Sequence, residues 1–272
     1  MKIAAIGDNC IDIYTNKGWM FPGGGPVNFA VHVRRLGAEA AYIGVIGNDH
    51  NGDIIEQALQ KEGVDTAFLL RREGKTAVAF VELIGTERTF IGKDPGVREQ
   101  LREVLRSDPG QFLEFIQSYD LVHTTLDGVV DEQIPTWWRS GIRLSYDFSH
   151  RATQEQIALL PYIEIAIFSG QHHQKEDAPP FLADCLEQGC KLALMTFGER
   201  GSVAYDGKQF YWQEAVPVEI VDTLGAGDTF QAGFIYAYLQ GQPVQECLRQ
   251  GALLAAKNSM SYGGFGYCEK TV

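Results

Sequence analysis

Between residues 120 and 198 the sequence repeats one pattern, in which a short apolar run is followed by a segment with helical spacing. The apolar runs are DLVHTT (120–125), IRLSYDF (142–148), EIAIFS (164–169) and KLALMTFG (191–198), and the helical segments lie near 132–139, 154–160 and 180–188. Strands that alternate with helices of this length predict a mainly parallel sheet with helices on both faces. We therefore expect an α/β protein, and 272 residues are enough for one large domain of that class.

The rest of the chain extends this alternation, and two hairpins interrupt it. We predict strands at 2–6, 40–47 and 216–221, helices within 21–37, 54–64, 97–119, 228–239 and 243–260, and a hairpin at 201–212 that turns at Asp206-Gly207. Two β-prone runs flank Gly85-Thr86, so residues 76–92 predict a second hairpin. A hairpin has no place in a parallel sheet, so we expect a flap to which residues 14–21 contribute. Two ordinary edge strands are the alternative.

Composition and charge limit the classes of partner. The chain is 45% hydrophobic and 21% charged, with a net charge of -12, which argues against nucleic acid or an anionic membrane as the main partner. Its five cysteines form no C-x-x-C pair, which is typical of reduced thiols in a cytoplasmic protein. We find no signal-peptide pattern and no apolar run that approaches the roughly 18 to 20 residues of a membrane span.

The segment DTLGAGDTF (222–230) joins the predicted strand at 216–221 to a helical run that begins near Asp228. Gly225 and Gly227 let backbone amides approach an anion closely, and the helix start adds a favourable dipole. The segment therefore predicts a phosphate or oxyanion cradle with a carboxylate beside it. A tight turn followed by an acidic first helical turn is the alternative interpretation.

Three other glycine-bearing junctions follow or precede predicted elements at positions where α/β folds bind ligands. They are a polar turn after the first strand with Asp8, Asn9 and Asp12, the segment GGGPVN (23–28) with Asn28 in a first helical turn, and TFGERG (196–201). None ends in the Gly-Lys-Ser/Thr of a P-loop, and none is a G-x-G-x-x-G after the first strand. P-loop and dehydrogenase functions are therefore disfavoured.

Together these residues resemble the PfkB (ribokinase-like) family of carbohydrate kinases over essentially the whole chain. The matching segments are GDNCID (7–12), GGGPVN (23–28), the hairpin at 76–92, TFGERG (196–201) and the highly specific signature DTLGAGDTF (222–230). Within that family, the IGDNCIDIY start, the YDFS at 146–149 and Ser169 are most similar to fructosamine kinases, which include the fructoselysine 6-kinases.

The resemblance implies a ribokinase-like three-layer αβα sandwich with a mainly parallel central sheet. It implies a small β-sheet lid from about 13–21 and 76–92, within a single kinase domain over 1–272. It also implies transfer of the γ-phosphoryl group of ATP, with Mg²⁺, to a sugar hydroxyl. Relatives often dimerise through the lid, and the apolar residues Val78, Phe80 and Phe90 need a cover, so we expect a homodimer.

The resemblance also implies roles for single residues around the signature. Asp228 matches the catalytic base, and Gly225, Ala226 and Gly227 match the anion hole. The helix dipole is expected to keep the pKa of Asp228 low. Accurate placement offsets a low pKa, because the sugar hydroxyl becomes acidic as it attacks and its proton is accepted late.

The remaining implied positions bind the sugar, the nucleotide and metal ions. Positions that hold sugar hydroxyls are matched by Asp12, Gly24 and Asn28. The nucleotide-binding segment is matched by Thr196, Gly198 and Gly201. Asp222 matches a position associated with a monovalent cation, which implies K⁺. Asp8 and Arg88 are our candidates for pairing with the group attached to the sugar.

The chain departs from the family pattern at two places. Many members have Asn-x-x-Glu after the strand that corresponds to 164–168, whereas this chain has Ser169-Gly170-Gln171-His172, with Glu176 as the candidate magnesium-associated carboxylate. Ribokinase itself has a lysine where Gly25 stands, which disfavours ribose as the substrate.

Three functional hypotheses follow from these residues. The first is an ATP-dependent kinase for the 6-hydroxyl of fructoselysine or a related fructosamine. The second keeps the fold and changes the substrate to fructose, another ketose or a nucleoside. The third is a catalytically silent sugar-binding relative, against which the intact glycine cradle and Asp228 argue.

Overall fold

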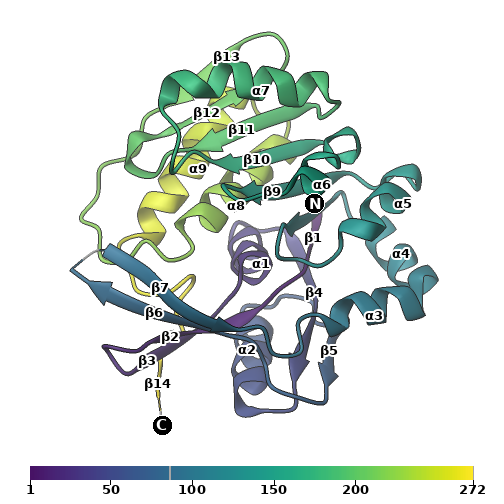
Figure 1. Cartoon of the computed structure of the whole chain (residues 1–272), viewed down its shortest axis with the longest axis vertical. Coiled ribbons are helices and arrows are strands. Elements are labelled where there is room, and N and C mark those ends of the chain that lie inside the picture. Colours follow the sequence, from purple (N-terminus) through teal and green to yellow (C-terminus); the bar gives the residue numbers. More distant parts are fainter. Residues whose placement is uncertain (86, 272) are drawn as a thin grey trace.

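The computed structural model describes residues 1–85 and 87–271. In it, a large sheet lies between two layers of helices, and a smaller sheet lies at one end (Figure 1). In spatial order the large sheet contains β13 (Phe210–Gln213), β12 (Ser202–Tyr205), β11 (Leu192–Thr196), β10 (Ile165–Ser169), β9 (Leu144–Ser149), β8 (Leu121–Thr125), β1 (Lys2–Ile6), β4 (Glu39–Gly47) and β5 (Leu69–Arg72). From β11 to β5 all neighbours pair in parallel, and β12 and β13 form the predicted antiparallel hairpin. The α/β prediction is confirmed.

The order of the strands reverses at β1. The chain passes from β1 to β4 and β5 on one side, and it later returns to β8 and continues outward through β9, β10 and β11 on the other side. In open α/β sheets, ligands bind outside the carboxyl ends of the strands at such a reversal. The topology therefore predicts a ligand-binding site at the loops after β1 and β8.

Two hydrophobic cores lie on opposite faces of the large sheet. Alternate residues of β1 separate them, since Ile3 packs in one core and Ala4 in the other. The first core contains α1 (Gly25–Arg35), α2 (His50–Lys61), α8 (Ala226–Leu239) and α9 (Val244–Asn258). The second contains α3 (Gln100–Ser107), α4 (Pro109–Gln117), α5 (Ile134–Arg139) and α7 (Ala178–Glu187). This arrangement confirms the predicted three layers.

Short helices occupy several of the remaining connections. They are α6 (Gln154–Ile157) and the 3-10 helices η1 (Asp131–Gln133), η2 (Leu160–Tyr162), η3 (Lys175–Asp177) and η4 (Gly198–Arg200). The helix expected near 154–160 is thus shorter than predicted, because Pro161 follows it.

The smaller sheet forms the lid. Its strands, in spatial order, are β14 (Glu269–Lys270), β3 (Trp19–Gly23), β2 (Cys10–Tyr14), β6 (Val78–Ile84) and β7 (Glu87–Asp94). The hairpin of β6 and β7 confirms the prediction for 76–92, with Thr86 of its turn outside the described residues. The sheet is larger than expected, because it starts at Cys10 and includes β14 near the C-terminal end.

The lid has its own small core. Tyr14, Phe21, Val81 and Leu83 of the lid strands are buried together with Leu224 of the signature segment. The lid is therefore packed directly on the loop that the sequence analysis singled out.

Two sequence predictions were wrong, and one strand was missed. Asp12 lies in strand β2 and not in a polar turn, and β5 was missed because Arg71 and Arg72 mask a half-buried edge strand. Residues 216–221 form no strand, and Pro217 within them cannot donate a ladder hydrogen bond. Among residues 1–85 and 87–271, every helix is too short or too polar to span a bilayer.

Candidate active site

The signature segment forms the start of helix α8. Gly225 is the residue before the helix, and its φ of +71° is a left-handed conformation that favours glycine. The amide and the hydroxyl of Thr229 both donate to Gly225 O, at 2.9 and 2.7 Å, and hold this turn. A side chain at Gly227 would meet no atom of the described residues within 4 Å. The surface at Gly227 is therefore open to a ligand, as an anion cradle requires, whereas the Ala226 amide donates to Thr223 O at 3.2 Å.

Asp228 lies in this first turn and contacts the start of α1. Asn28 Nδ2 donates to Asp228 Oδ2 at 2.7 Å, so the first turns of two helices meet at one carboxylate. Asn28 Oδ1 is buried, and no group of the described residues donates to it. This oxygen can therefore accept a hydrogen bond from a ligand hydroxyl.

Burial raises the pKa of Asp228 to about 7, and the hydrogen bond from Asn28 acts in the opposite direction. The charges of Asp147 and Asp8 add to the upward shift. The expectation that the helix dipole holds this pKa low was wrong, because loss of water around the carboxylate outweighs the dipole here. A carboxylate with a pKa near 7 is suited to accept a proton at neutral pH.

Asp12 and Gly24 lie on the lid side of the same space. Asp12 is on β2 and only 3% exposed, and burial raises its pKa to about 7. Gly24 lies between β3 and α1, one turn before Asn28, whose amide donates to Gly24 O at 2.9 Å.

Arg88 reaches this space from lid strand β7. Its positive charge acts to lower the pKa of both Asp12 and Asp228. Arg88 Nε and Nη1 are buried without a hydrogen-bond partner among the described residues. The lid therefore supplies a cation whose donors are available to a ligand.

Asp8 follows β1 at the reversal of the sheet. Thr125 Oγ1, at the end of β8, donates to Asp8 Oδ1 at 3.0 Å, and burial raises the pKa of Asp8 to about 6. A Cβ on Gly25 would lie 3.1 Å from Thr125 Cγ2 and 3.4 Å from Asp228 Oδ1. Gly25 thus leaves the space between Asp8 and Asp228 free of a side chain.

The predicted nucleotide-binding residues lie further along the same sheet edge. Thr196 ends β11, Gly198 begins η4 and Gly201 precedes β12. Arg200 donates to the carbonyls of Gly170 and His173, at 3.0 and 3.1 Å, and so joins η4 to the loop after β10. β11 is separated from β8 by β9 and β10, so this segment does not contact Asp8.

The structure does not bring Glu176 to the Asp228 site. Glu176 is exposed on η3, and no hydrogen bond or ion pair among residues 1–85 and 87–271 joins it to that site. The described residues also contain no group of three or more His, Cys, Asp or Glu side chains that could hold a metal ion. The chain's own donors therefore form no complete metal cage in the described structure.

Asp222 is fully buried and ties three segments together. It accepts hydrogen bonds from the hydroxyl of Tyr14 in the lid, the amide of Leu224 and the amide of Gly263, the last two at 3.0 Å. These bonds use three of the roughly four lone-pair directions of a carboxylate. Asp222 thus joins the lid, the signature loop and the C-terminal segment.

Sequence reasoning missed several side chains at this edge. Gln231, one turn after Asp228, donates from Nε2 to Asp147 Oδ2 at 2.7 Å, and the Ser149 amide donates to Asp147 Oδ1 at 2.7 Å. Thr125 was missed as well. Helical spacing from Asp228 predicts the position of Gln231, and the strand end at YDFS predicts that of Asp147.

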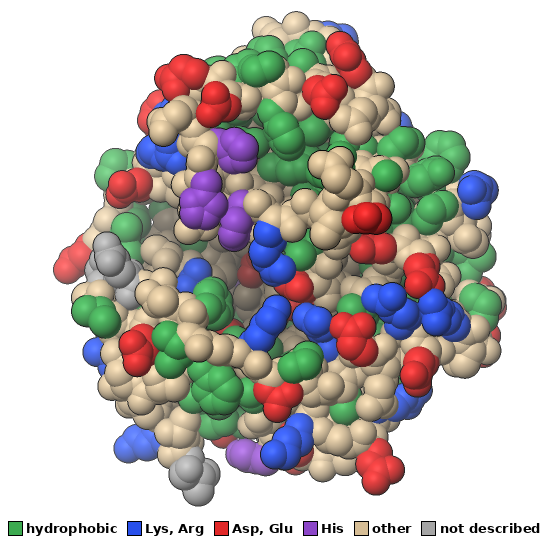
Figure 2. Space-filling view, viewed as in Figure 1, with side chains coloured by type: hydrophobic (Ala, Val, Ile, Leu, Met, Phe, Trp, Pro, Cys, Tyr) green, Lys and Arg blue, Asp and Glu red, His purple; other side chains and the backbone are tan. Residues whose placement is uncertain are grey.

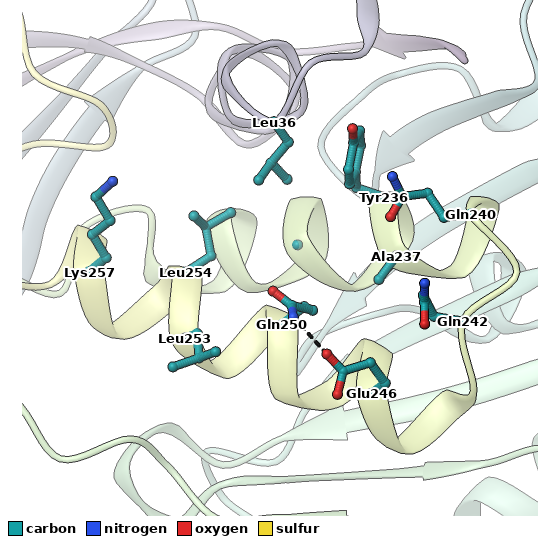
Figure 3. A pocket seen from close by; sticks show the side chains of 11 residues that line it. Leu36, Tyr236, Ala237, Gln240, Gln242, Glu246, Gln250, Leu253, Leu254 and Lys257 are labelled. Atoms are coloured by element: carbon teal, nitrogen blue, oxygen red, sulfur yellow. Dashed lines mark hydrogen bonds between the residues drawn. The ribbon is translucent and has the colours of Figure 1, made fainter.

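A separate cavity of about 410 Å³ lies between the end of α1 and helices α8 and α9 (Figure 3). Leu36, Tyr236 and Leu254 are among its lining residues, and it shares no residue with the site around Asp228. The chemistry at the start of α8 is therefore independent of this cavity.

The fold and the site together define a class. Solved structures share the ribokinase-like fold: a probable sugar kinase of Rhizobium etli has a TM-score of 0.82 at 20% identity and covers 97% of this chain and 94% of its own. A ribokinase of Arabidopsis thaliana, in complex with ribose and ATP, has a TM-score of 0.81 at 22% identity and covers 96% and 93%. This confirms the predicted fold.

The chain belongs to the PfkB family of carbohydrate kinases, whose family model matches residues 3–136 and 162–269. It is 33% identical to the fructosamine kinase FrlD of Bacillus subtilis over 98% of this chain and 94% of that protein. It is 32% identical to the fructoselysine 6-kinase of Escherichia coli over 97% and 99%. The protein is therefore a sugar kinase, a phosphotransferase with an alcohol group as acceptor, and the predicted family is confirmed.

Proposed function

We propose that this kinase transfers the γ-phosphoryl group of ATP to the 6-hydroxyl of fructoselysine or a related fructosamine. Relatives that are more than 30% identical over nearly the whole chain include a fructosamine kinase and a fructoselysine 6-kinase. The observation that supports phosphoryl transfer most directly is Asp228, a carboxylate with a pKa of about 7 next to Gly227, where the surface of the helix start is open.

In this proposal each part of the α8 start has one task. Asp228 accepts the proton of the attacking hydroxyl as the bond from its oxygen to phosphorus forms and the bond from phosphorus to the ADP oxygen breaks. The amides of Gly225 and Gly227 stabilise the charge on the transferring group, and that of Ala226 joins them when its 3.2 Å hydrogen bond to Thr223 O is exchanged for one to the phosphoryl oxygen. Asn28 fixes the orientation of Asp228 through its 2.7 Å hydrogen bond.

The sugar is bound between the lid and the start of α1. Asp12 and Asn28 Oδ1 accept hydrogen bonds from sugar hydroxyls, and Gly24 lets the ring lie close to the backbone. Asp8 pairs with the secondary ammonium that links the sugar to its substituent, since a cation favours the charged form of a carboxylate whose pKa is raised. Arg88 donates to the substrate from the lid.

ATP is bound along Thr196, Gly198 and Gly201, and Mg²⁺ enters with the nucleotide. Mg²⁺ in kinases is held mainly by phosphate oxygens, water and one or two carboxylates, so a site without an all-protein cage fits this ion. Bound Mg²⁺ neutralises charge on the phosphates, and Glu176 is our candidate for a carboxylate near it. A K⁺ site at Asp222 remains a prediction.

Three broader properties belong to the same proposal. Residues 1–272 act as one kinase domain in the cytoplasm, with sugar and ATP as small-molecule partners. The lid forms a homodimer through its exposed apolar side chains, since Ile84, Phe90 and Ile91 are 73%, 56% and 51% exposed.

A panel of sugars tests the proposed substrate. ADP release is measured with ATP and Mg²⁺ in the presence of fructoselysine, fructose, ribose and adenosine. We expect fructoselysine to give the highest kcat/KM, with phosphate on its 6-oxygen. A higher kcat/KM for fructose or a nucleoside contradicts the fructosamine proposal. Thermal stabilisation by a sugar without any ADP release supports the non-catalytic sugar-binding hypothesis.

A further inference from the structure

Three charged side chains from three loops meet at the carboxyl edge of the large sheet. Asp127 follows β8, Arg151 follows β9, and Arg98 lies between lid strand β7 and helix α3. Arg98 Nη1 is 3.6 Å from Asp127 Oδ1, and Arg151 Nη2 contacts Asp127 Oδ2. Arg98 Nη2 also donates to Glu99 Oε1 at 3.0 Å, on the adjacent residue. We call Asp127, Arg151 and Arg98 the Asp127 cluster. Their side chains are 21% to 48% exposed, so a ligand can reach them.

The Asp127 cluster lies beside Asp8, at the reversal of the sheet. A Cβ on Gly7 would be only 2.8 Å from the Cα of Gly128. The backbone just before Asp8 is therefore in contact with the backbone just after Asp127. The charge of Asp127 raises the pKa of Asp8, and that of Arg98 lowers it. Figure 2 shows basic and acidic side chains together beside a hollow in this face. The cluster is therefore adjacent to the group that we assign to the sugar's amine.

The position of this cluster beside Asp8 distinguishes it from a neighbouring cluster of arginines. Arg102 and Arg106 pair with Glu132 at 3.4 and 2.6 Å and simply join α3 to η1. Such exposed pairs stabilise a protein by about 0–1 kcal/mol. The pairing is similar at both places, since two guanidinium groups meet one carboxylate, and Arg98 Nε and Arg102 Nε are both buried without a partner among the described residues. Of the two clusters, the Asp127 cluster is the one that lies beside Asp8.

The chemistry of the cluster matches a zwitterion. Guanidinium groups bind a carboxylate through paired hydrogen bonds, and a carboxylate binds an ammonium group. The α-carboxylate and α-ammonium of an amino acid present these two charges on one carbon. We infer that Arg98 and Arg151 bind the α-carboxylate, and Asp127 the α-ammonium, of the amino acid attached to the sugar. This inference rests on the proposed fructosamine substrate and extends it to the amino-acid end.

The first test compares two substrates of the unaltered enzyme. Fructoselysine has the zwitterionic end, and N-(1-deoxyfructosyl)-n-butylamine has the same sugar and linking amine without it. We expect kcat/KM to be roughly tenfold to a hundredfold higher for fructoselysine, the effect of one or two charge-assisted hydrogen bonds. Equal values overturn the inference and leave the fructosamine proposal intact. No activity with either compound, while fructose is phosphorylated, contradicts the proposed function instead.

The second test uses the double variant Arg98→Gln/Arg151→Gln, with Arg106→Gln as the matched control. We expect kcat/KM for fructoselysine to fall roughly tenfold to a hundredfold. The value for the butylamine compound and the KM for ATP should stay within about twofold of those of the unaltered enzyme. An equal fall in kcat/KM for fructoselysine and the butylamine compound, or a raised KM for ATP, overturns the inference. The arginines would then act on the fold or on the nucleotide.

Discussion

At the scale of single residues, the site is defined by carboxylates that have lost most of their water. Burial is the largest influence on the pKa of Asp8, Asp12 and Asp228, and it raises all three. Sequence alone gave the identity and order of these residues, because the glycines and the strand ends that place them are local features. It could not give the pKa of Asp228, since that value depends on Asn28, 200 positions away, and on the lid.

The pKa of Asp228 predicts that the rate of phosphoryl transfer falls at acid pH. A general base must be deprotonated, so kcat/KM for the sugar should fall about tenfold per pH unit below pH about 7. The pKa of Asp12 is also raised to about 7, so protonation of Asp12 contributes to the fall in the same pH range. The check is a pH profile from 5 to 9, with circular dichroism at each pH to confirm that the protein is folded. A constant kcat/KM down to pH 5 argues against a carboxylate base with a raised pKa.

At the scale of elements, the lid and the signature loop are one packed unit. Leu224 lies in the core of the lid, and Asp222 accepts a hydrogen bond from Tyr14. The alternation of apolar runs predicted most strands and helices, because the parallel strands are buried on both faces. The prediction of a strand at 216–221 was wrong. Its half-exposed residues alternate as in a strand, but the segment pairs with no strand, and Pro217 cannot donate a ladder hydrogen bond.

Removal of the Tyr14 hydroxyl tests this coupling. Tyr14→Phe leaves the buried Asp222 with one donor fewer, so the free energy of unfolding should fall by about 1–3 kcal/mol. The KM for the sugar should rise, because the lid is less firmly fixed to the start of α8. Urea unfolding and steady-state kinetics measure these effects. Tyr205→Phe on β12 of the other sheet is the control, and equal behaviour of the two variants contradicts the coupling.

At the scale of the whole molecule, the exposed apolar side of the lid predicts a homodimer. In solution at micromolar concentration the mass should be twice the 30.1 kDa of one chain. Ile91→Asp places a charge in the expected interface and should give monomers. Leu253→Asp, on α9, is the control and should remain dimeric. Light scattering after size exclusion measures both, and a monomeric mass for the unaltered protein contradicts the prediction.

The whole chain was recognisable from sequence because its motifs are spaced along all of it. The carboxyl edge of the large sheet contains TFGERG, which follows β11. The starts of helices α1 and α8 contain the GGGPVN segment and the signature, as the predicted topology requires. The Asp127 cluster could not be predicted, because its members come from three loops with no common pattern. Only the reversal of the strand order brings Asp127 next to Asp8.

The most direct measurement is ADP formation from ATP and fructoselysine by Asp228→Asn beside the unaltered enzyme. The variant keeps the shape of the side chain and removes the base, so we expect turnover to fall by about 10²–10⁴ while ATP binding and the fold are retained. Asp184→Asn, at an exposed position on α7, should turn over normally. Equal rates for Asp228→Asn and the unaltered enzyme would contradict the assignment of Asp228 as the base at the start of α8.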